Sequence, residues 1–157
     1  MVIGDRKRIP KRAQFPLPIE RLEDRWMLSA ELVKDINQTG AESRPTQLAR
    51  VGDRVFFAAN DGVHGIELWV SNGTSGGTYL VKDINPGPGD SSPRSIADIN
   101  GIAYFSADDG VHGLELWKSD GTESGTVLIK DLDPSFGSDP REFTSLNGAL
   151  TMFCANN

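Results

Sequence analysis

The chain has 157 residues, of which 38% are hydrophobic and 17 are glycine, and its formal net charge is −6. This composition is typical of a turn-rich protein, and no run of about 18 apolar residues is present that would predict a transmembrane helix. The charge distribution excludes a nucleic-acid surface over most of the chain, because residues 1–14 carry +4 and the remainder −10, whereas phosphate binding needs clustered Lys and Arg.

The first 31 residues differ from the rest of the chain in charge and pattern. Residues 1–17 are basic and interrupted by proline, so we expect this tail to be disordered. Residues 18–31 favour a short amphipathic helix, because Ile19, Leu22 and Trp26 recur at helical spacing and a proline suits the first helical position. We therefore divide the chain into the tail, this helical motif and the region from residue 32 to residue 157.

The helical motif resembles a known export signature. The stretch IERLEDRWMLSAE, residues 19–31, is similar to a short N-terminal motif of planctomycete extracellular proteins, and Leu22, Glu23, Arg25 and residues 28–30 carry the resemblance. The resemblance implies export to the cell surface or outside the cell. An ordinary signal peptide differs, since it places an apolar core of about 7–15 residues after the basic flank.

From residue 32 onward the sequence is a repeat with a period of 48 residues. Residues 57–86 and 105–134 align without a gap and are identical at 19 of 30 positions. The later part of a preceding copy is visible in residues 33–36, and a last copy is incomplete at the C-terminus. Self-similarity at such a period indicates structural units that pack against one another.

Each repeat has the pattern of short strands separated by turns. Apolar or alternating runs predict strands at residues 55–59, 66–70, 78–84 and 95–99. The pair at residues 72–73, Asn-Gly, predicts a type I′ hairpin turn, because both central residues of that turn need positive φ. A repeat therefore holds four short antiparallel strands.

This strand count predicts an all-β fold of four-stranded antiparallel blades of the β-propeller type. The chain holds about two and a half repeats, whereas a propeller closes with at least about four blades, so we expect an incomplete propeller that is truncated at its C-terminus. The strand edges that stay unpaired would favour self-association with other molecules.

The second strand of the repeat alternates between two faces. Ile66, Leu68 and Val70 share one face, and Glu67 and Trp69 share the other. Because both faces of a blade meet a neighbouring blade, we expect Trp69 to pack at one of these junctions.

A buried carboxylate in a strand needs a partner, and each repeat offers one. Lys82 lies on the strand after Glu67, and Lys130 lies on the strand after Glu115. We expect each lysine to pair with the glutamate of its own repeat.

The repeated sequence resembles the repeats of a known family. The tracts ELWVSNGTSGGT and ELWKSDGTESGT are similar to the ELWxxDGT repeats of bacterial surface and secreted proteins, some of them described as hyalin-like. Asn72 departs from the pattern, where the family has Asp. The resemblance implies an extracellular, non-catalytic protein of adhesion or aggregation, with other repeat modules, a surface protein or a glycan as partner. The residues that carry the repeat are Asp61, Gly62, His64, Gly65, Glu67, Leu68, Trp69, Gly73, Thr74, Gly77, Thr78, Lys82, Asp83, Asp109, Gly110, His112, Gly113, Glu115, Leu116, Trp117, Gly121, Thr122, Gly125, Thr126, Lys130 and Asp131.

The two histidines of the chain occupy equivalent turns, each after an Asp-Gly pair. Aspartate and histidine side chains are also ligands that zinc accepts. His64 and His112 lie one repeat apart, which is too far for one ion in the usual blade geometry. We therefore interpret both histidines as turn residues.

Calcium is the only cofactor that the sequence suggests, because acidic residues lie in two of the predicted turns. Asp35 and Asn37 alternate before a glycine, and Asp131 with Asp133 recur at the same place in a later repeat, as at the start of an EF-hand loop. The glutamate that completes such a loop is missing, because Thr46 stands at its position. We expect strand-end turns at both places, and no cofactor beyond this calcium possibility.

No motif of the sequence nominates a catalytic residue. Gly73, Ser75 and Gly77 match the G-x-S-x-G spacing of a nucleophile elbow, but an elbow joins a strand to a helix, and this tract lies in a predicted hairpin. The second repeat also places Glu123 at the position of the serine. Cys154 is the only cysteine, so neither an intrachain disulfide nor a cysteine metal cluster can form.

These patterns favour a non-enzymatic extracellular or cell-surface repeat module that acts by adhesion, self-association or ligand binding. Two alternatives remain. In the first, the chain is a truncated fragment without independent function. In the second, it is a piece of a carbohydrate-active propeller enzyme whose active site takes residues from further blades.

Overall fold

The structure, a computed structural model, describes residues 31–134, 137–146 and 149–154. Residues Leu32–Asn157 form one compact unit. The disordered tail expected at residues 1–17 and the helix expected at residues 18–31 lie outside the described residues, except for Glu31 at the helix end, which is exposed and has no regular structure.

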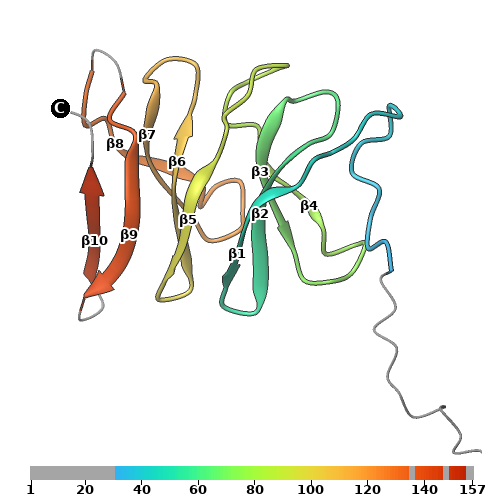
Figure 1. The fold of residues 1–157 in the computed structure, drawn as a ribbon, viewed down its shortest axis with the longest axis horizontal. Helices are drawn as coiled ribbons and strands as arrows, with labels where there is room; N and C mark the ends of the chain where they lie inside the picture. The colour runs from blue at the N-terminus through green and yellow to red at the C-terminus, as the bar shows by residue number, and fades with distance from the viewer. Residues whose placement is uncertain (1–30, 135–136, 147–148, 155–157) are drawn as a thin grey trace, which may run out of the picture. The chain divides into compact units, whose positions relative to one another are not determined.

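The described residues form three antiparallel sheets of short strands (Figure 1). The strands are β1 (Thr46–Val51), β2 (Arg54–Asn60), β3 (Ile66–Ser71), β4 (Tyr79–Lys82), β5 (Arg94–Ile99), β6 (Ile102–Asp108), β7 (Leu114–Ser119), β8 (Val127–Lys130), β9 (Pro140–Leu146) and β10 (Ala149–Cys154). The first sheet has the order β1-β2-β3-β4, the second has the order β5-β6-β7-β8, and the third pairs β9 with β10.

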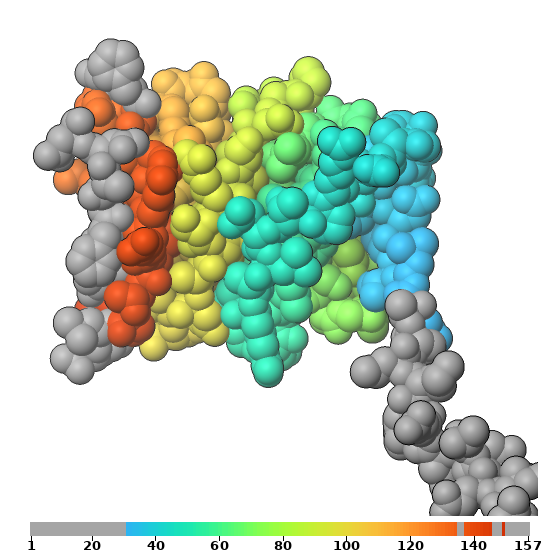
Figure 2. All heavy atoms as spheres, in the orientation of Figure 1, coloured from blue at the N-terminus to red at the C-terminus, as the bar shows by residue number. Residues whose placement is uncertain are grey.

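The all-β prediction is confirmed, because strands are the only regular elements of the described residues. None of the described segments is a helix long and apolar enough to cross a membrane. The second sheet lies between the first and the third, and the space-filling view shows neighbouring sheets in direct contact (Figures 1 and 2). The three sheets do not close into a ring, so the propeller itself stays a prediction.

The boundary between sheets differs from the predicted boundary between repeats. The strand expected at residues 95–99 as the last of its unit is β5, the first strand of the next sheet. The reason is the two-residue turn after it: Asn100 and Gly101 both have positive φ, 56° and 81°, and Ile99 pairs with Ile102. This tight hairpin joins β5 to β6, and the longer loop before β5 separates the sheets.

The connection between β3 and β4 also differs from its prediction. It is not a two-residue turn but a loop of seven residues, because β3 ends at Ser71 and β4 begins at Tyr79. Only Gly73 has positive φ, whereas a type I′ turn needs positive φ at both central positions. The Asn72 side-chain oxygen instead accepts hydrogen bonds from the backbone N–H of Thr74, at 3.0 Å, and from its hydroxyl, at 2.7 Å.

The core of the unit lies between sheets. Val70 of β3 belongs to one buried cluster together with Phe105 and Trp117 of the second sheet. Trp69 points to the opposite face of β3, where it belongs to a separate cluster that Ile36 of the N-terminal segment covers. The alternation predicted for this strand is therefore confirmed, and each large side chain buried at the junctions stabilises the stack by about 1.5–3 kcal/mol.

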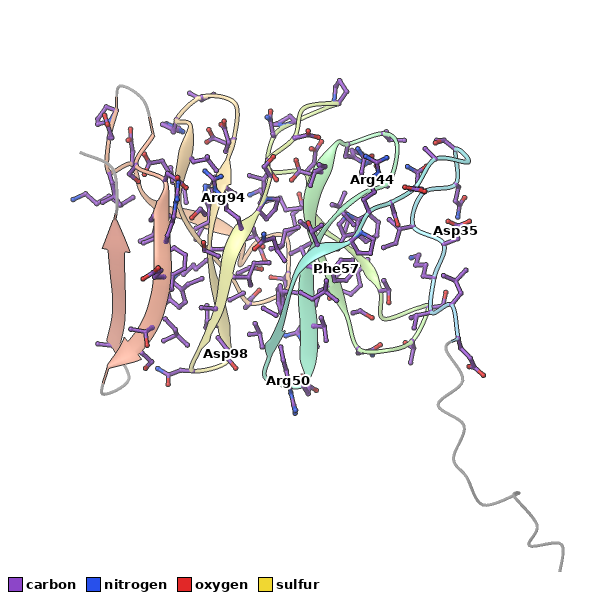
Figure 3. All side chains as sticks on the ribbon, in the orientation of Figure 1. Asp35, Arg44, Arg50, Phe57, Arg94 and Asp98 are labelled. Atoms are coloured by element: carbon purple, nitrogen blue, oxygen red, sulfur yellow. The ribbon has the colours of Figure 1, made fainter. Side chains whose placement is uncertain are left out.

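The first strands of neighbouring sheets are tied to one another. The strands β1, β5 and β9 share an irregularity near their starts, where the pairing with the neighbouring strand shifts register. The residues at this place have positive φ between 54° and 56°; they are Gln47, Ser95 and Glu142. The Gln47 side chain accepts a hydrogen bond from the Ser95 N–H at 3.3 Å. At the other end of these strands, Asp98, labelled in Figure 3, accepts the Gly52 N–H at 3.0 Å.

Candidate functional site

A fully buried glutamate stands at the same position in both four-stranded sheets. In the first sheet, Glu67 Oε2 accepts the Ile84 N–H at 3.0 Å and the Ser91 hydroxyl at 2.6 Å. Its Oε1 accepts the N–H groups of Asn85, at 3.3 Å, and of Ser91, at 3.1 Å. The carboxylate thus holds the loop that connects the first sheet to the second.

Glu115 repeats this arrangement in the second sheet. It accepts the N–H groups of Leu132, Asp133 and Ser138 at 3.0, 3.3 and 2.9 Å, and the Ser138 hydroxyl at 2.7 Å. Two carboxylates in equivalent positions therefore each satisfy four buried or half-buried donors, which is the compensation that a buried charge requires.

The predicted pairing of these glutamates with lysines is wrong. Lys82 stands opposite Leu68 in the strand pairing, so its side chain faces the next sheet and not Glu67. Its amine donates to the Thr126 carbonyl oxygen of the second sheet at 3.0 Å. The amine of Lys34, one repeat earlier, donates in the same way to the Thr78 carbonyl oxygen at 2.7 Å. Lys82 therefore joins the first sheet to the second, and Lys34 joins the segment before β1 to the first sheet.

For Lys130 the same prediction fails for the same reason. Lys130 stands opposite Leu116 in the strand pairing, while Glu115 is occupied by the loop that follows β8. The side chain of Lys130 is exposed and has no hydrogen-bond partner in the described part of the chain.

Burial raises the pKa of Glu67 to about 7, while the hydrogen bonds from Ser91, Ile84 and Asn85 act in the opposite direction. The Glu67 side chain is fully buried. A raised carboxyl pKa can mark a general acid, but a group enclosed by main-chain donors has no room for a substrate. Glu67 therefore has a structural role, which is to hold the loop between the first and second sheets.

The two histidine turns are built identically. Asp61 Oδ1 accepts the N–H groups of Val63 and His64, each at 2.9 Å, and its Oδ2 lies 2.7 Å from His64 Nδ1. This hydrogen bond raises the pKa of His64. Burial alone would raise the pKa of Asp61, but the hydrogen bonds from the His64 backbone and ring lower it overall. Asp109 and His112 repeat the geometry, also at 2.7 Å.

The structure places the calcium candidates in different repeats. Asn37 is buried, and its oxygen accepts the Thr39 N–H and hydroxyl at 3.0 and 2.6 Å, as a turn residue does. Asp35 is exposed, whereas Asp131 and Asp133 lie two repeats further along the chain. Among residues 31–134, 137–146 and 149–154, no three His, Cys, Asp or Glu side chains are grouped to hold a metal ion.

Ser75 of the G-x-S-x-G match lies exposed in the loop between β3 and β4. Since both neighbouring elements are strands, the elbow geometry is absent at this place. The loop is closed instead by a hydrogen bond of 2.7 Å between the hydroxyls of Ser71 and Thr78, and Ser119 and Thr126 repeat it.

Sequence reasoning missed the serines that bind the glutamates. Ser91 follows Glu67 by 24 residues, and Ser138 follows Glu115 by 23. The loops before the two serines differ by one residue, so the ungapped alignment at a period of 48 does not bring them together. An alignment that allows one gap after Pro86 would have found the pair.

Taken together, the recurring glutamates, the Asp–His pairs and Lys82 bind main-chain groups or one another. Two other recurring groups are buried without a hydrogen-bond partner: Nε1 of Trp69 and Trp117, and Oδ1 of Asp83 and Asp131. The arrangement can lock loops and join sheets. Comparison with known proteins finds no matching family model, no matching curated protein and no matching solved structure.

Proposed function

We propose that the chain is a non-enzymatic repeat module of the ELWxxDGT type that acts outside the cell or at its surface. Its blades, the arc of a propeller, support adhesion or self-association or bind a protein or glycan. The resemblance of residues 19–31 to an export motif supports the location, and the resemblance of the repeat tracts supports the role.

One observation carries this proposal. Three recurring side chains are engaged in building the stack: Glu67 holds its loop, Asp61 pairs with His64, and Lys82 binds the next sheet. A side chain held by several structural hydrogen bonds is a poor general acid or nucleophile, because a reacting group must be free to bind its substrate. What remains for function is the surface that the stacked sheets present.

Two measurements test the proposal. The whole chain is expressed in a planctomycete host, and its accessibility to protease on intact cells is compared with that of a variant lacking residues 19–31. Beads coated with the purified chain are scored for aggregation against beads coated with the heat-unfolded chain. Surface exposure that needs residues 19–31, and aggregation by the folded chain alone, are expected. A chain that stays inside the cell and leaves beads dispersed, or that turns over a polysaccharide, contradicts the proposal.

A further inference from the structure

A depression of about 220 Å³ opens at the junction between the first and second sheets. It lies where the first strands of the two sheets begin, since Thr46 is the first residue of β1 and Arg94, labelled in Figure 3, is the first residue of β5. The other lining residues come from β1, β2, β3 and the loop before β5; they are Gln47, Ala58, Ile66, Ser92 and Pro93. Both sheets therefore contribute to the depression.

Charged side chains occupy the corresponding place between the second and third sheets. Arg94, which follows Thr46 by one period, pairs there with Asp139, and its Nη2 lies 2.6 Å from Asp139 Oδ1. Asp139 corresponds to Ser92, because each donates its N–H to the carbonyl oxygen of the residue that begins the third strand of the preceding sheet, at 2.9 and 3.1 Å. Thr46 and Ser92 are shorter than arginine and aspartate, so they leave space at the first junction.

A third replacement enlarges the same space. At the second junction the Ser106 hydroxyl donates to the Pro140 carbonyl oxygen. Ala58 stands at the position of Ser106, and it has no hydroxyl for the carbonyl of Pro93, which is the counterpart of Pro140. All three positions carry the smaller side chain at the first junction, so the depression follows from the sequence that is particular to this junction.

The side chains around the depression offer hydrogen-bond donors that the described residues do not all use. Arg94 binds Asp139 through Nη2, whereas its Nε is buried without a hydrogen-bond partner in this part of the chain. The Gln47 side-chain oxygen accepts a main-chain N–H at 3.3 Å, which leaves the NH2 group to donate. Thr46 and Ser92 are exposed, and their hydroxyls can donate or accept.

The ion-pair cluster beside the depression has an excess of positive charge. Asp139 accepts a hydrogen bond from Arg141 at 2.8 Å in addition to pairing with Arg94, so two guanidinium groups share one carboxylate. Asp90, on the loop before β5, instead accepts the Ile66 N–H at 2.7 Å, and no ion pair among the described residues joins it to Arg94. An excess of one positive charge suits a ligand with a single carboxylate better than a phosphate group, which carries more charge.

The size of the depression and its apolar side limit the ligand further. Sites that enclose drug-sized ligands measure about 300–1,000 Å³, so 220 Å³ fits one small ring. Ala58, Ile66 and Pro93 give this ring an apolar surface, whereas the hydroxyls and the amide suit a ring that carries hydroxyl groups. A ring with hydroxyl groups and one carboxylate is a sugar acid.

We propose that the depression between the first and second sheets binds a uronic acid, either as a free sugar or as the terminal unit of an acidic glycan. Its carboxylate accepts hydrogen bonds from the guanidinium of Arg94, its ring hydroxyls bind Ser92, Thr46 and the Gln47 amide, and its C–H face lies on Pro93. The site rests on the proposed function, because it narrows the glycan ligand of that module to an acidic one.

The test titrates the whole chain with sodium galacturonate and follows the sugar by saturation-transfer difference NMR. Saturable binding with a dissociation constant of about 1 mM is expected. Galactose, which lacks the carboxylate, and acetate, which lacks the ring, should each bind at least about tenfold more weakly. Tetragalacturonate distinguishes the two sources of the ligand: tighter binding than that of the single sugar identifies a glycan end, and equal binding identifies the free sugar.

Ser92 provides a matched pair of variants. Ser92→Asp and Ser92→Asn place side chains of nearly equal shape in the depression, and both residue types tolerate the φ of 47° at this position, as Asp139 does at 43°. Only Ser92→Asp adds a negative charge beside Arg94, so it should bind galacturonate at least about tenfold more weakly than Ser92→Asn. Ser75→Asp, in the exposed part of the β3–β4 loop, controls for the added charge and should bind as the unchanged chain does.

Thermal melts establish that each variant is folded before binding is measured, and the comparison of the three small ligands on the unchanged chain needs no variant. Absence of saturation at about 100 mM galacturonate, equal binding of galactose or acetate, or equal binding by Ser92→Asp and Ser92→Asn overturns the sugar-acid site. Bead aggregation is scored separately: if it persists without galacturonate binding, only the sugar-acid site falls, and if galacturonate binds while beads stay dispersed, only the adhesive function falls.

Discussion

Gly121 and Gly73 offer a matched pair for testing how the sheets are joined. They occupy the same position in equivalent loops, with φ of +87° and +86°. A Cβ on Gly73 would meet nothing within 4 Å, whereas a Cβ on Gly121 would lie 2.4 Å from Arg54 Nη1 and 3.3 Å from Phe56 Cζ. Gly121→Ala and Gly73→Ala therefore share the same backbone strain, and only Gly121→Ala adds a collision across the sheet junction.

The expected losses follow from these contacts. Alanine at positive φ costs about 1 kcal/mol in either loop. In Gly121→Ala, Arg54 must also move, which breaks its 2.8 Å hydrogen bond to the Asp120 carbonyl, worth about 0.5–1.5 kcal/mol. It also leaves the Phe56 ring, whose centroid lies 5.8 Å away, at a further cost of about 0.5–1 kcal/mol. The free energy of unfolding should fall by about 1 kcal/mol in Gly73→Ala and about 2–3.5 kcal/mol in Gly121→Ala.

Urea unfolding followed by tryptophan fluorescence measures this difference, and thermal melts should show it as about 3–5 °C for each 1 kcal/mol. Arg54→Ala provides the second arm of a double-mutant cycle: in that background Gly121→Ala should cost little more than Gly73→Ala does, because the colliding side chain is gone. Equal losses for the two single variants, or a loss in Gly121→Ala that Arg54→Ala leaves unchanged, would refute the contact between Arg54 and the turn at Asp120 and Gly121.

Three further outcomes are expected. Lys82→Met should lower the free energy of unfolding by about 1 kcal/mol, because it removes the hydrogen bond to the Thr126 carbonyl oxygen, and Lys130→Met, at an exposed side chain, by less than about 0.5 kcal/mol. Equal effects in urea titrations would show that the Lys82 hydrogen bond does not stabilise the junction between the sheets. The pKa of Glu67, raised by burial from 4.5 to about 7, gives a stabilisation that is present below pH 4.5 and lost as the pH rises through 7. The raised pKa of His64 adds a stabilisation lost above pH 6.5, so calorimetry should find the chain more stable at pH 5 than at pH 8. Glu67→Gln should reduce that difference, and an unchanged difference would show that the carboxyl does not cause it.

The sequence predicted those features of the fold that depend on neighbouring residues. Alternation along residues 66–70 placed Val70 and Trp69 on opposite faces, and the structure buries them in separate clusters. Turn-forming residues located most strand ends within a few positions. These patterns succeed because the side-chain period of a strand and the φ preferences of Asn and Gly act over a few residues.

The features that were missed depend on residues far apart in the chain. The sheet boundary before β5 follows from which strands pair, and the partner of Lys82 follows from the opposite position of Leu68 in the register. Neither the sheet boundary nor the partner of Lys82 can be predicted from a local sequence pattern. Ser91 lies in a loop whose length differs between repeats, so the residue that completes the Glu67 site carried no periodic signal.

Equivalent positions of the two repeats show how the surroundings of a residue, and not its type alone, determine its burial. Gly73 and Gly121 have the same identity, loop and φ, yet one is exposed and the other buried, so the difference comes only from the sheet that follows or precedes them. The same logic applies to Phe56 and Tyr104, which occupy one position in two sheets: the side chain that a neighbouring turn covers is buried, and the other lines an open depression.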